Sequence, residues 1–223
     1  MIRKSVLVLT VFALCAACAT TSGSKKMYVE VEADPEGASV SYRGTTLGSA
    51  PISFRITSIK DVLDIDARLE GQALVEKRVR VTSDDSIEVS FRFGDEESAL
   101  AKALGLTRVV VFDYSDRTTF DLEQATLKPK FLPMLEQQAE LLNTAFADLD
   151  VFVCGFTDTT GTSDFNLDLS LRRAEAVSEF LKSRGVSGDR LKIQGFGESY
   201  PIARNDTREG RALNRRTEIV LPQ

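Results

Sequence analysis

The chain has 223 residues, 43% hydrophobic and 27% charged, which is typical of a globular protein with one large or two small domains. Its formal net charge of −5 gives no electrostatic support for general binding to DNA, RNA or an anionic bilayer, so we expect no nucleic-acid partner. The chain contains no histidine. This excludes Ser-His and Cys-His nucleophile systems and most zinc peptidase sites.

The first residues have the order of a secretory signal: a basic start at Arg3 and Lys4, an apolar run from Val6, and small residues before Cys18. That run is shorter than the roughly 20 apolar residues of a membrane-spanning helix. The stretch LCAAC resembles the lipobox of bacterial lipoproteins, which implies that Cys18 becomes the first residue and carries lipid. Residues 1–17 are then the signal peptide and 18–26 a lipidated linker; an ordinary signal peptide is the alternative. By resemblance to the lipoprotein sorting rule, Ala19 implies attachment to the outer membrane, with the domains facing the periplasm.

Cys154 is the only cysteine that would remain unmodified, so no intrachain disulfide is expected. It lies inside the apolar run DVFVCGF, where a free thiol is more often a small core residue than a nucleophile. We expect no catalytic residue, metal or cofactor in this chain.

Residues 27–94 alternate apolar and polar positions in short runs separated by turn residues, which predicts about six strands in a small antiparallel β-sandwich or barrel. The order Pro35, Glu36, Gly37, Ala38, followed by glycines at 44 and 48 and a proline at 51, resembles the PEGA domain. The resemblance implies a cell-envelope β-domain without a ligand that can be transferred residue by residue. A spacer is the simpler interpretation, and a binding role is the alternative.

The acidic, alanine-rich residues 95–107 predict a short helical or flexible linker. From 108 to 223 the pattern changes to strands at 108–114, 149–156, 190–196 and 215–221 that alternate with helices at about 127–146, 164–184 and 207–213. This order, βαβαβαβ, predicts a layered α/β domain in which helices cover the sheet.

The central stretch of this domain, GFTDTTGTSDFNLDLSLRRAEAV, places Asp158 in a turn after a strand and Arg173 on the following helix, which Ser163 or Asp164 could cap. The helix carries two stripes of residues. We expect the first to face inward, and it consists of Leu167, Leu171, Ala174, Val177, Ser178 and Leu181. The second lies about a quarter turn away and consists of Asn166, Ser170 and Arg173. Asp158 and Arg173 could form a structural salt bridge. They could instead hold a zwitterionic ligand, since a carboxylate accepts hydrogen bonds from an ammonium and a guanidinium grips a carboxylate.

Three separated motifs resemble the OmpA/Pal-type C-terminal domain, which binds peptidoglycan. They are the stretch above, GFGESYP from Gly195, and GRALNRRTEIV from Gly210. The resemblance implies that Asp158 and Arg173 bind diaminopimelate of the peptidoglycan stem peptide. By the same matching, Thr157, Asn166 and Leu169 lie in the pocket wall and Arg216 is a candidate second contact. The sequence departs from the family pattern at Phe156 and near Glu123.

These observations predict an outer-membrane lipoprotein that tethers the membrane to peptidoglycan without covalent bonds. An enzyme would need a second carboxylate such as Glu198 beside Asp158, and their spacing does not ask for glycosidase chemistry. A third possibility is an envelope protein-interaction module or assembly scaffold that keeps the fold but does not bind the wall. We expect Arg172 to face solvent or pair with Asp168. A local basic region, formed by the arginines at 204, 208, 211, 215 and 216, could meet the acidic peptides of the glycan strands, although we expect about half of these arginines to pair with Asp206, Glu209 or Glu218.

Overall fold

The computed structural model describes residues 26–83, 85–115, 119–121 and 123–223 of the chain. The predicted signal peptide and the predicted lipidation site, Cys18, lie outside these residues, as does all of the predicted linker except Lys26. In the described part of the chain, no helix is long and apolar enough to cross a membrane.

The described residues between Met27 and Phe93 form seven strands, where the sequence predicted about six. They are β1 (Met27–Asp34), β2 (Ser39–Tyr42), β3 (Thr45–Ser49), β4 (Ile52–Ile56), β5 (Ile65–Arg68), β6 (Leu74–Ser83) and β7 (Ser86–Phe93), with a 3-10 helix, η1 (Ile59–Asp64), before β5. In β1 and β7 buried and more exposed residues alternate, because successive side chains of a strand point to opposite faces of the sheet. Most pairings are antiparallel as predicted, but β1 pairs with β7 in parallel.

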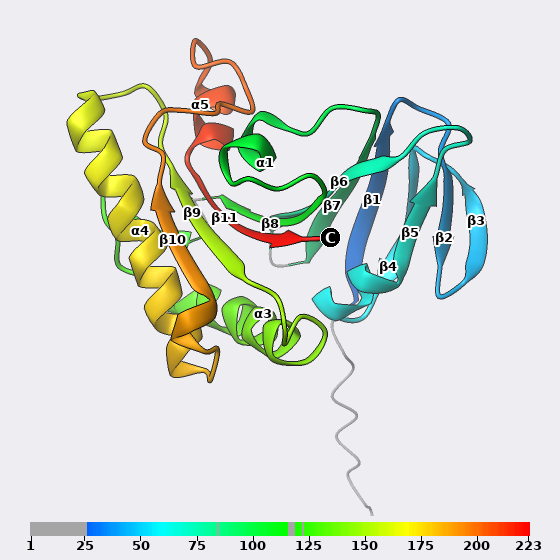
Figure 1. The fold of residues 1–223 in the computed structure, drawn as a ribbon, viewed down its shortest axis with the longest axis horizontal. Helices are drawn as coiled ribbons and strands as arrows, with labels where there is room; N and C mark the ends of the chain where they lie inside the picture. The colour runs from blue at the N-terminus through cyan, green and yellow to red at the C-terminus, as the bar shows by residue number, and fades with distance from the viewer. Residues whose placement is uncertain (1–25, 84, 116–118, 122) are drawn as a thin grey trace, which may run out of the picture.

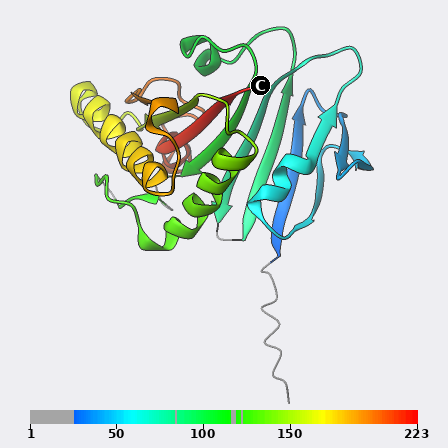
Figure 2. The ribbon, with the colours of Figure 1, turned by 60° about the horizontal axis from the view of Figure 1, so that its bottom comes forward.

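The C-terminal part has the predicted βαβαβαβ order. Its elements are β8 (Val109–Ser115), the 3-10 turn η2 (Pro129–Phe131) with α3 (Leu132–Thr144), β9 (Val151–Phe156), α4 (Ser163–Ser183), η3 (Gly188–Arg190) with β10 (Leu191–Gly195), α5 (Arg208–Asn214) and β11 (Arg216–Pro222). Figure 2 shows α3 and α4 side by side over the same side of the sheet. The order of elements was therefore readable from the hydrophobic periodicity alone.

The two parts share one eight-stranded sheet, in the order β10-β9-β11-β8-β6-β7-β1-β4 (Figure 1). The sheet crosses the predicted boundary where β6 runs parallel to β8, with Glu76 opposite Val109 and Val81 opposite Tyr114. The predicted linker, residues 95–107, contains the short helix α1 (Ala99–Ala103), whose Leu100 and Ala101 pack against the sheet. The remaining strands form a small second sheet, in the order β3-β2-β5.

The hydrophobic core also crosses the predicted boundary. One cluster of buried side chains extends from Val40 of the small sheet, through Val79 and Val89 of the large sheet, to Leu135 of α3 and Leu181 of α4. A smaller cluster lies on the opposite face of the large sheet, where α1 covers Val109 and Val111 beside Cys154. Cys154 is fully buried and unbonded, and burial raises the pKa of its thiol, which confirms its place in the core.

Charged side chains connect four strands on the face that carries α1. Arg78 of β6 lies 2.5 Å from Glu218 of β11 and 3.3 Å from Asp113 of β8, and Arg80 bridges Asp113 and Glu88 of β7. Burial alone raises the pKa of Glu218, but the guanidinium groups of Arg78 and Arg216 outweigh it and lower this pKa to about 2. Glu218 is therefore ionised at neutral pH and joins the two parts of the sheet electrostatically.

Candidate functional site

Two glycines allow α4 to pack closely on the sheet, and this packing positions the residues of the candidate site. A Cβ atom on Gly155 of β9 would lie 1.9 Å from the carbonyl oxygen of Ser170, and one on Gly195 of β10 would lie 2.7 Å from the backbone nitrogen of Leu171. No side chain fits at either position, so the backbone of α4 lies directly on the two strands. The first turns of the helix therefore reach the end of β9, where Asp158 follows.

The predicted inward stripe of α4 is confirmed at Ala174, Val177, Ser178 and Leu181 and is wrong at Leu167 and Leu171. The buried residues of α4 are Asn166, Leu169, Ser170, Arg173, Ala174, Val177, Ser178 and Leu181. Leu167 and Leu171, predicted to face inward, are 52% and 38% exposed. The second, polar stripe is buried as well, because each of its members finds a partner: the Ser170 hydroxyl, for example, accepts from the Gly197 amide at 2.9 Å. The N-cap is also different, since the Thr162 side chain, and not Ser163 or Asp164, accepts from the Phe165 amide.

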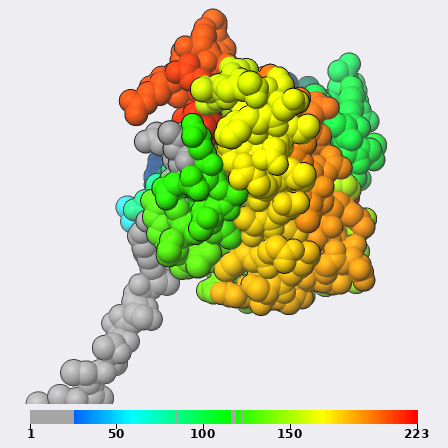
Figure 3. Space-filling view, turned by 90° about the vertical axis from the view of Figure 1, so that its left-hand side faces the viewer, coloured from blue at the N-terminus to red at the C-terminus, as the bar shows by residue number. Residues whose placement is uncertain are grey.

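A pocket of about 430 Å³ opens between α4, α5 and the loop after β9; we call it the α4–α5 pocket. In Figure 3, α5 stands in orange-red beside the yellow-green first turns of α4 at one end of the molecule. The volume is within the range of roughly 300–1,000 Å³ typical of ligand sites. The lining residues are Glu123, Thr157, Asp158, Thr160, Gly161, Phe165, Asn166, Leu169, Arg173, Arg208, Arg211 and Arg215.

Asp158 lies in the wall of the pocket and is 5% exposed. Its Oδ1 accepts from the Thr160 amide at 2.7 Å, and its Oδ2 lies 2.5 Å from the Arg215 guanidinium. Burial raises the pKa of this carboxyl, and these two contacts outweigh burial and lower it below its usual value. Asp158 is thus an ionised, oriented acceptor at neutral pH.

Arg173 faces the same pocket from α4, although only 1% of its surface is exposed. Its Nε donates to the Gln124 carbonyl oxygen at 3.0 Å, and its guanidinium lies 5.2 Å from the centre of the Phe120 ring. Both contacts hold the planar group in one orientation. The structure therefore brings the predicted pair, Asp158 and Arg173, into one pocket, while the cation bound to the Asp158 carboxylate is Arg215.

The predicted wall residues Thr157, Asn166 and Leu169 all line the pocket. Asn166 is held in place by two hydrogen bonds, since its amide nitrogen donates to the Asp158 carbonyl oxygen at 3.2 Å and to the Glu198 carboxylate at 2.8 Å. Glu198 also accepts from Ser163 at 3.0 Å. The loop carrying Glu198 is in this way attached to the first turn of α4.

Arg216, the predicted second contact, does not line the pocket. It is 2% exposed, its Nε donates to Glu218 at 2.7 Å, and its guanidinium stacks 3.8 Å from the centre of the Phe156 ring. Because alternate residues of a strand point to opposite faces, Arg216 belongs to the charged network under α1, whereas Arg215, just before β11, reaches the pocket.

The sequence placed Arg208, Arg211 and Arg215 in a basic region that could meet acidic peptides, but it did not name them as pocket residues; all three line the pocket. The signal was present in their spacing of three and four residues, which places Arg208 and Arg211 on one face of a helix with Arg215 just past its end. Glu123 also lines the pocket, with a backbone φ of 58°, a left-handed conformation that asparagine and aspartate adopt more readily than glutamate.

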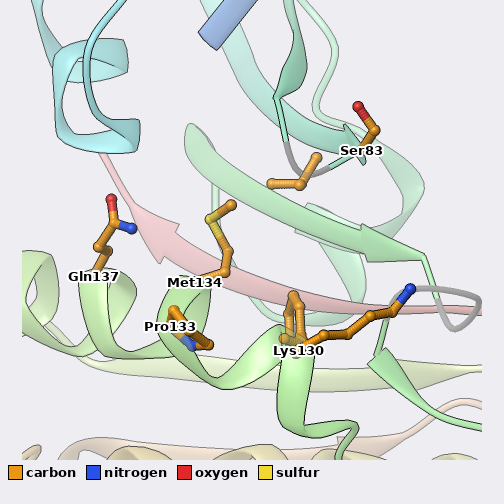
Figure 4. A pocket seen from close by; sticks show the side chains of 7 residues that line it. Ser83, Lys130, Pro133, Met134 and Gln137 are labelled. Carbon is orange, nitrogen blue, oxygen red and sulfur yellow. The ribbon is translucent and has the colours of Figure 1, made fainter. Parts of the chain in front are cut away.

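A second cavity lies at the junction of the two parts of the chain, between the end of β6 and the start of α3 (Figure 4). It measures about 180 Å³ and is lined by Val81, Ser83, Lys130, Phe131, Pro133, Met134 and Gln137. Among the described residues that line it, Lys130 is the one charged side chain, so they do not provide the opposed charges of the α4–α5 pocket.

Comparison with known proteins places the pocket in a known family of domains. Residues 119–215 match the family model described as "OmpA family", and this segment includes every lining residue of the α4–α5 pocket. The chain contains an OmpA-like domain. The match begins after β8 and ends before β11, so it leaves the N-terminal strands without a family assignment.

Similar proteins match the same half of the chain. "Probable lipoprotein YiaD" of Escherichia coli is 41% identical over 112 residues, which are 50% of this chain and 51% of that protein. "Outer membrane protein A" of Bordetella avium is 43% identical over 47% of this chain and 53% of that protein. "Peptidoglycan-binding protein ArfA" of Mycobacterium tuberculosis is 43% identical over 46% of this chain and 31% of that protein. The similarity thus spans about half of the first two relatives and less of the third.

Proposed function

We propose that this protein binds peptidoglycan through diaminopimelate of the stem peptide and tethers the outer membrane to the wall. The observation that carries the proposal is the presence of an ionised carboxylate, Asp158, and a buried, oriented guanidinium, Arg173, in one pocket. Diaminopimelate offers an ammonium for the first and a carboxylate for the second. A relative that is similar over this part of the chain is named a peptidoglycan-binding protein, which supports the same ligand class.

The proposed membrane attachment is a lipid on Cys18. It rests on the resemblance of LCAAC to a lipobox, and relatives named as a lipoprotein and an outer-membrane protein support an envelope location. We expect Cys18→Ser to move the protein from the outer-membrane fraction to the soluble periplasmic fraction. Retention of the variant in the membrane fraction would contradict lipid anchoring.

The N-terminal strands, which resemble a PEGA domain, would act as a rigid spacer between lipid and wall. The continuous sheet and the Arg78–Glu218 contact support rigidity, because both would have to break before the two parts could bend apart. No catalytic step belongs to this proposal. Glu198 accepts hydrogen bonds from Ser163 and Asn166, which favours a positioning role over acid–base chemistry. Release of soluble fragments from purified peptidoglycan by this protein would contradict that assignment.

The deciding experiment is calorimetric titration of residues 19–223 with a stem peptide containing diaminopimelate and with one containing lysine. The N-terminal strands are kept because β6 pairs with β8. We expect binding only to the diaminopimelate peptide, since its extra carboxylate is the group that Arg173 would hold. Binding should be lost in Asp158→Asn and in Arg173→Lys, which keeps the charge but removes the planar fork.

A matched pair of control variants lies on the same helix. Asp168 and Arg172 form an exposed ion pair at 2.8 Å, as the sequence predicted, and neither lines the pocket. Asp168→Asn and Arg172→Gln should therefore leave the affinity unchanged. If the unmutated protein binds neither peptide, peptidoglycan binding is refuted and the protein-interaction alternative is favoured.

A further inference from the structure

The α4–α5 pocket has more positive charge than its proposed diaminopimelate contacts require. Its lining carries four arginines, at 173, 208, 211 and 215, and two carboxylates, Glu123 and Asp158. This excess is local, since the chain as a whole has a net charge of −5. Asp158 and Arg173 account for one ammonium and one carboxylate of the ligand, so Arg208 and Arg211 of the lining have no ligand group assigned to them.

Two of these arginines, Arg208 and Arg211, have no carboxylate within ion-pair distance among the residues that the structure describes. Arg211 donates to the backbone carbonyl oxygen of Asn205 at 2.8 Å, which orients its guanidinium without neutralising it. Nearby arginines behave differently: Arg204 pairs with Asp206, Arg215 with Asp158 and Arg216 with Glu218. The uncompensated charges are therefore the two that line the pocket from α5.

The helix that carries them is fixed to its surroundings. Asn214 is fully buried and bonds the loop before α5 through the amides of Ile202 and Ala203, at 2.9 and 3.0 Å, and the carbonyl oxygen of Ala203, at 2.8 Å. A Cβ atom on Gly210 would lie 1.9 Å from the Arg204 carbonyl oxygen, so α5 packs backbone to backbone on that loop. The backbone of α5 therefore needs no ordering when a ligand binds, and the contact with Asn205 already orients the Arg211 guanidinium, so the main ordering cost falls on the Arg208 side chain.

We propose that Arg208 and Arg211 form a second carboxylate subsite beside the Asp158–Arg173 subsite. The pocket then prefers stem peptides that carry a free carboxylate in addition to the one on the diaminopimelate side chain, and it discriminates against amidated peptides. This inference rests on the proposed function and specifies its ligand further. The planar fork of arginine matches a carboxylate through two parallel hydrogen bonds, whereas a neutral amide offers one oxygen and no charge.

Two carboxylates of a stem peptide could supply this group: its C-terminal carboxylate and the free carboxylate of its glutamate residue. The test therefore uses residues 19–223 and three synthetic peptides that all contain diaminopimelate. One peptide is fully acidic, one is amidated at the C-terminus and one at the glutamate carboxyl. We expect one of the two amidations to weaken binding about tenfold, which identifies the carboxylate that the subsite holds.

The variant Arg208→Gln/Arg211→Gln should weaken binding of the acidic peptide by about the same factor and leave binding of the sensitive amidated peptide unchanged. Arg208→Gln alone gives a second test, because Arg208 is exposed and loses no hydrogen bond that the described residues provide. The control is Arg172→Gln/Arg204→Gln, which removes the same charge from two exposed arginines outside the pocket. It should bind the acidic peptide like the unmutated protein.

Three outcomes would overturn the subsite. They are equal affinity of the unmutated protein for all three peptides, equal losses for acidic and amidated peptides in the double variant, and a control variant that loses as much as the double variant. Each of these leaves the proposed function intact, because binding still depends on Asp158 and Arg173. Absence of binding to every peptide would instead refute the proposed function, and the subsite with it.

Discussion

Replacement of Gly155 by alanine should show how strongly the close packing of α4 on β9 affects both the stability of the protein and the geometry of the pocket. The new Cβ atom would lie 1.9 Å from the Ser170 carbonyl oxygen, while ordinary contact begins near 3.4 Å, so α4 must move from β9 by about 1.5 Å. A gap of about 0.5–1 Å already removes a quarter to a half of the dispersion attraction between packed atoms. Ala174, Val177 and Leu181 of this helix belong to the large core cluster and would lose contacts when the helix moves.

We expect Gly155→Ala to lower the free energy of unfolding by about 3 kcal/mol, at the upper end of the range for overpacked interiors, because the clashing atom is backbone and cannot change rotamer. The same displacement moves Asn166 and Arg173 away from Asp158, so binding of the stem peptide should weaken too. Urea unfolding followed by far-ultraviolet circular dichroism measures the first effect, and calorimetric titration measures the second.

Gly188→Ala is the matched control. A Cβ atom at Gly188 meets only Lys182 side-chain carbons, at 3.6 and 3.9 Å, so we expect a change within about 0.5 kcal/mol. Equal urea midpoints for the two variants would refute the reasoning, because the close approach at Gly155 would then contribute nothing to the seating of α4.

Three further predictions concern buried charge and the orientation of α4. Burial lowers the pKa of Lys77 from 10.5 to about 8, although Asp66 and Asp64 raise it in part. Between these pH values the unfolded chain holds a proton that the folded chain has lost, so stability rises with pH; relative to Lys77→Met, the unmutated protein should gain about 3 kcal/mol between pH 8 and 10.5 in urea unfolding. Glu218→Gln leaves buried guanidinium groups without their carboxylate and should cost about 3–5 kcal/mol at pH 7. Because the folded pKa of Glu218 is about 2 and its ordinary value 4.5, that difference should be complete above pH 4.5 and shrink as the pH falls towards 2; a constant difference would contradict the ionised network. Finally, Leu169→Ala should lower the free energy of unfolding by about 2–5 kcal/mol and Leu167→Ala by less than about 0.5 kcal/mol, because Leu169 is buried and Leu167 is exposed. A lower melting temperature for Leu167→Ala than for Leu169→Ala would contradict this orientation of α4.

The sequence by itself determined the order and type of the elements in the C-terminal part, because periodicity and glycine-rich turns are local properties of the chain. It also placed Asp158 and Arg173 close together at the end of β9, since Asp158 follows an apolar strand and the helix bearing Arg173 comes directly after, and the structure has both residues in one pocket. The motif resemblance to the OmpA/Pal-type domain agrees with the family match to residues 119–215.

Only the tertiary structure decided which side of α4 is buried. Leu167 and Leu171 satisfy helical periodicity as well as Leu169 does, but the contact of Ser170 with Gly155 sets the rotation of the helix, and that contact joins residues from different elements. The choice between Arg215 and Arg216 has the same origin, since the pairing of β11 with β8 and β9 sends Arg216 under α1 and leaves Arg215 for the pocket. The two parts likewise form one sheet because β6 pairs with β8. No pattern within either strand encodes this pairing, since each strand could pair with many others.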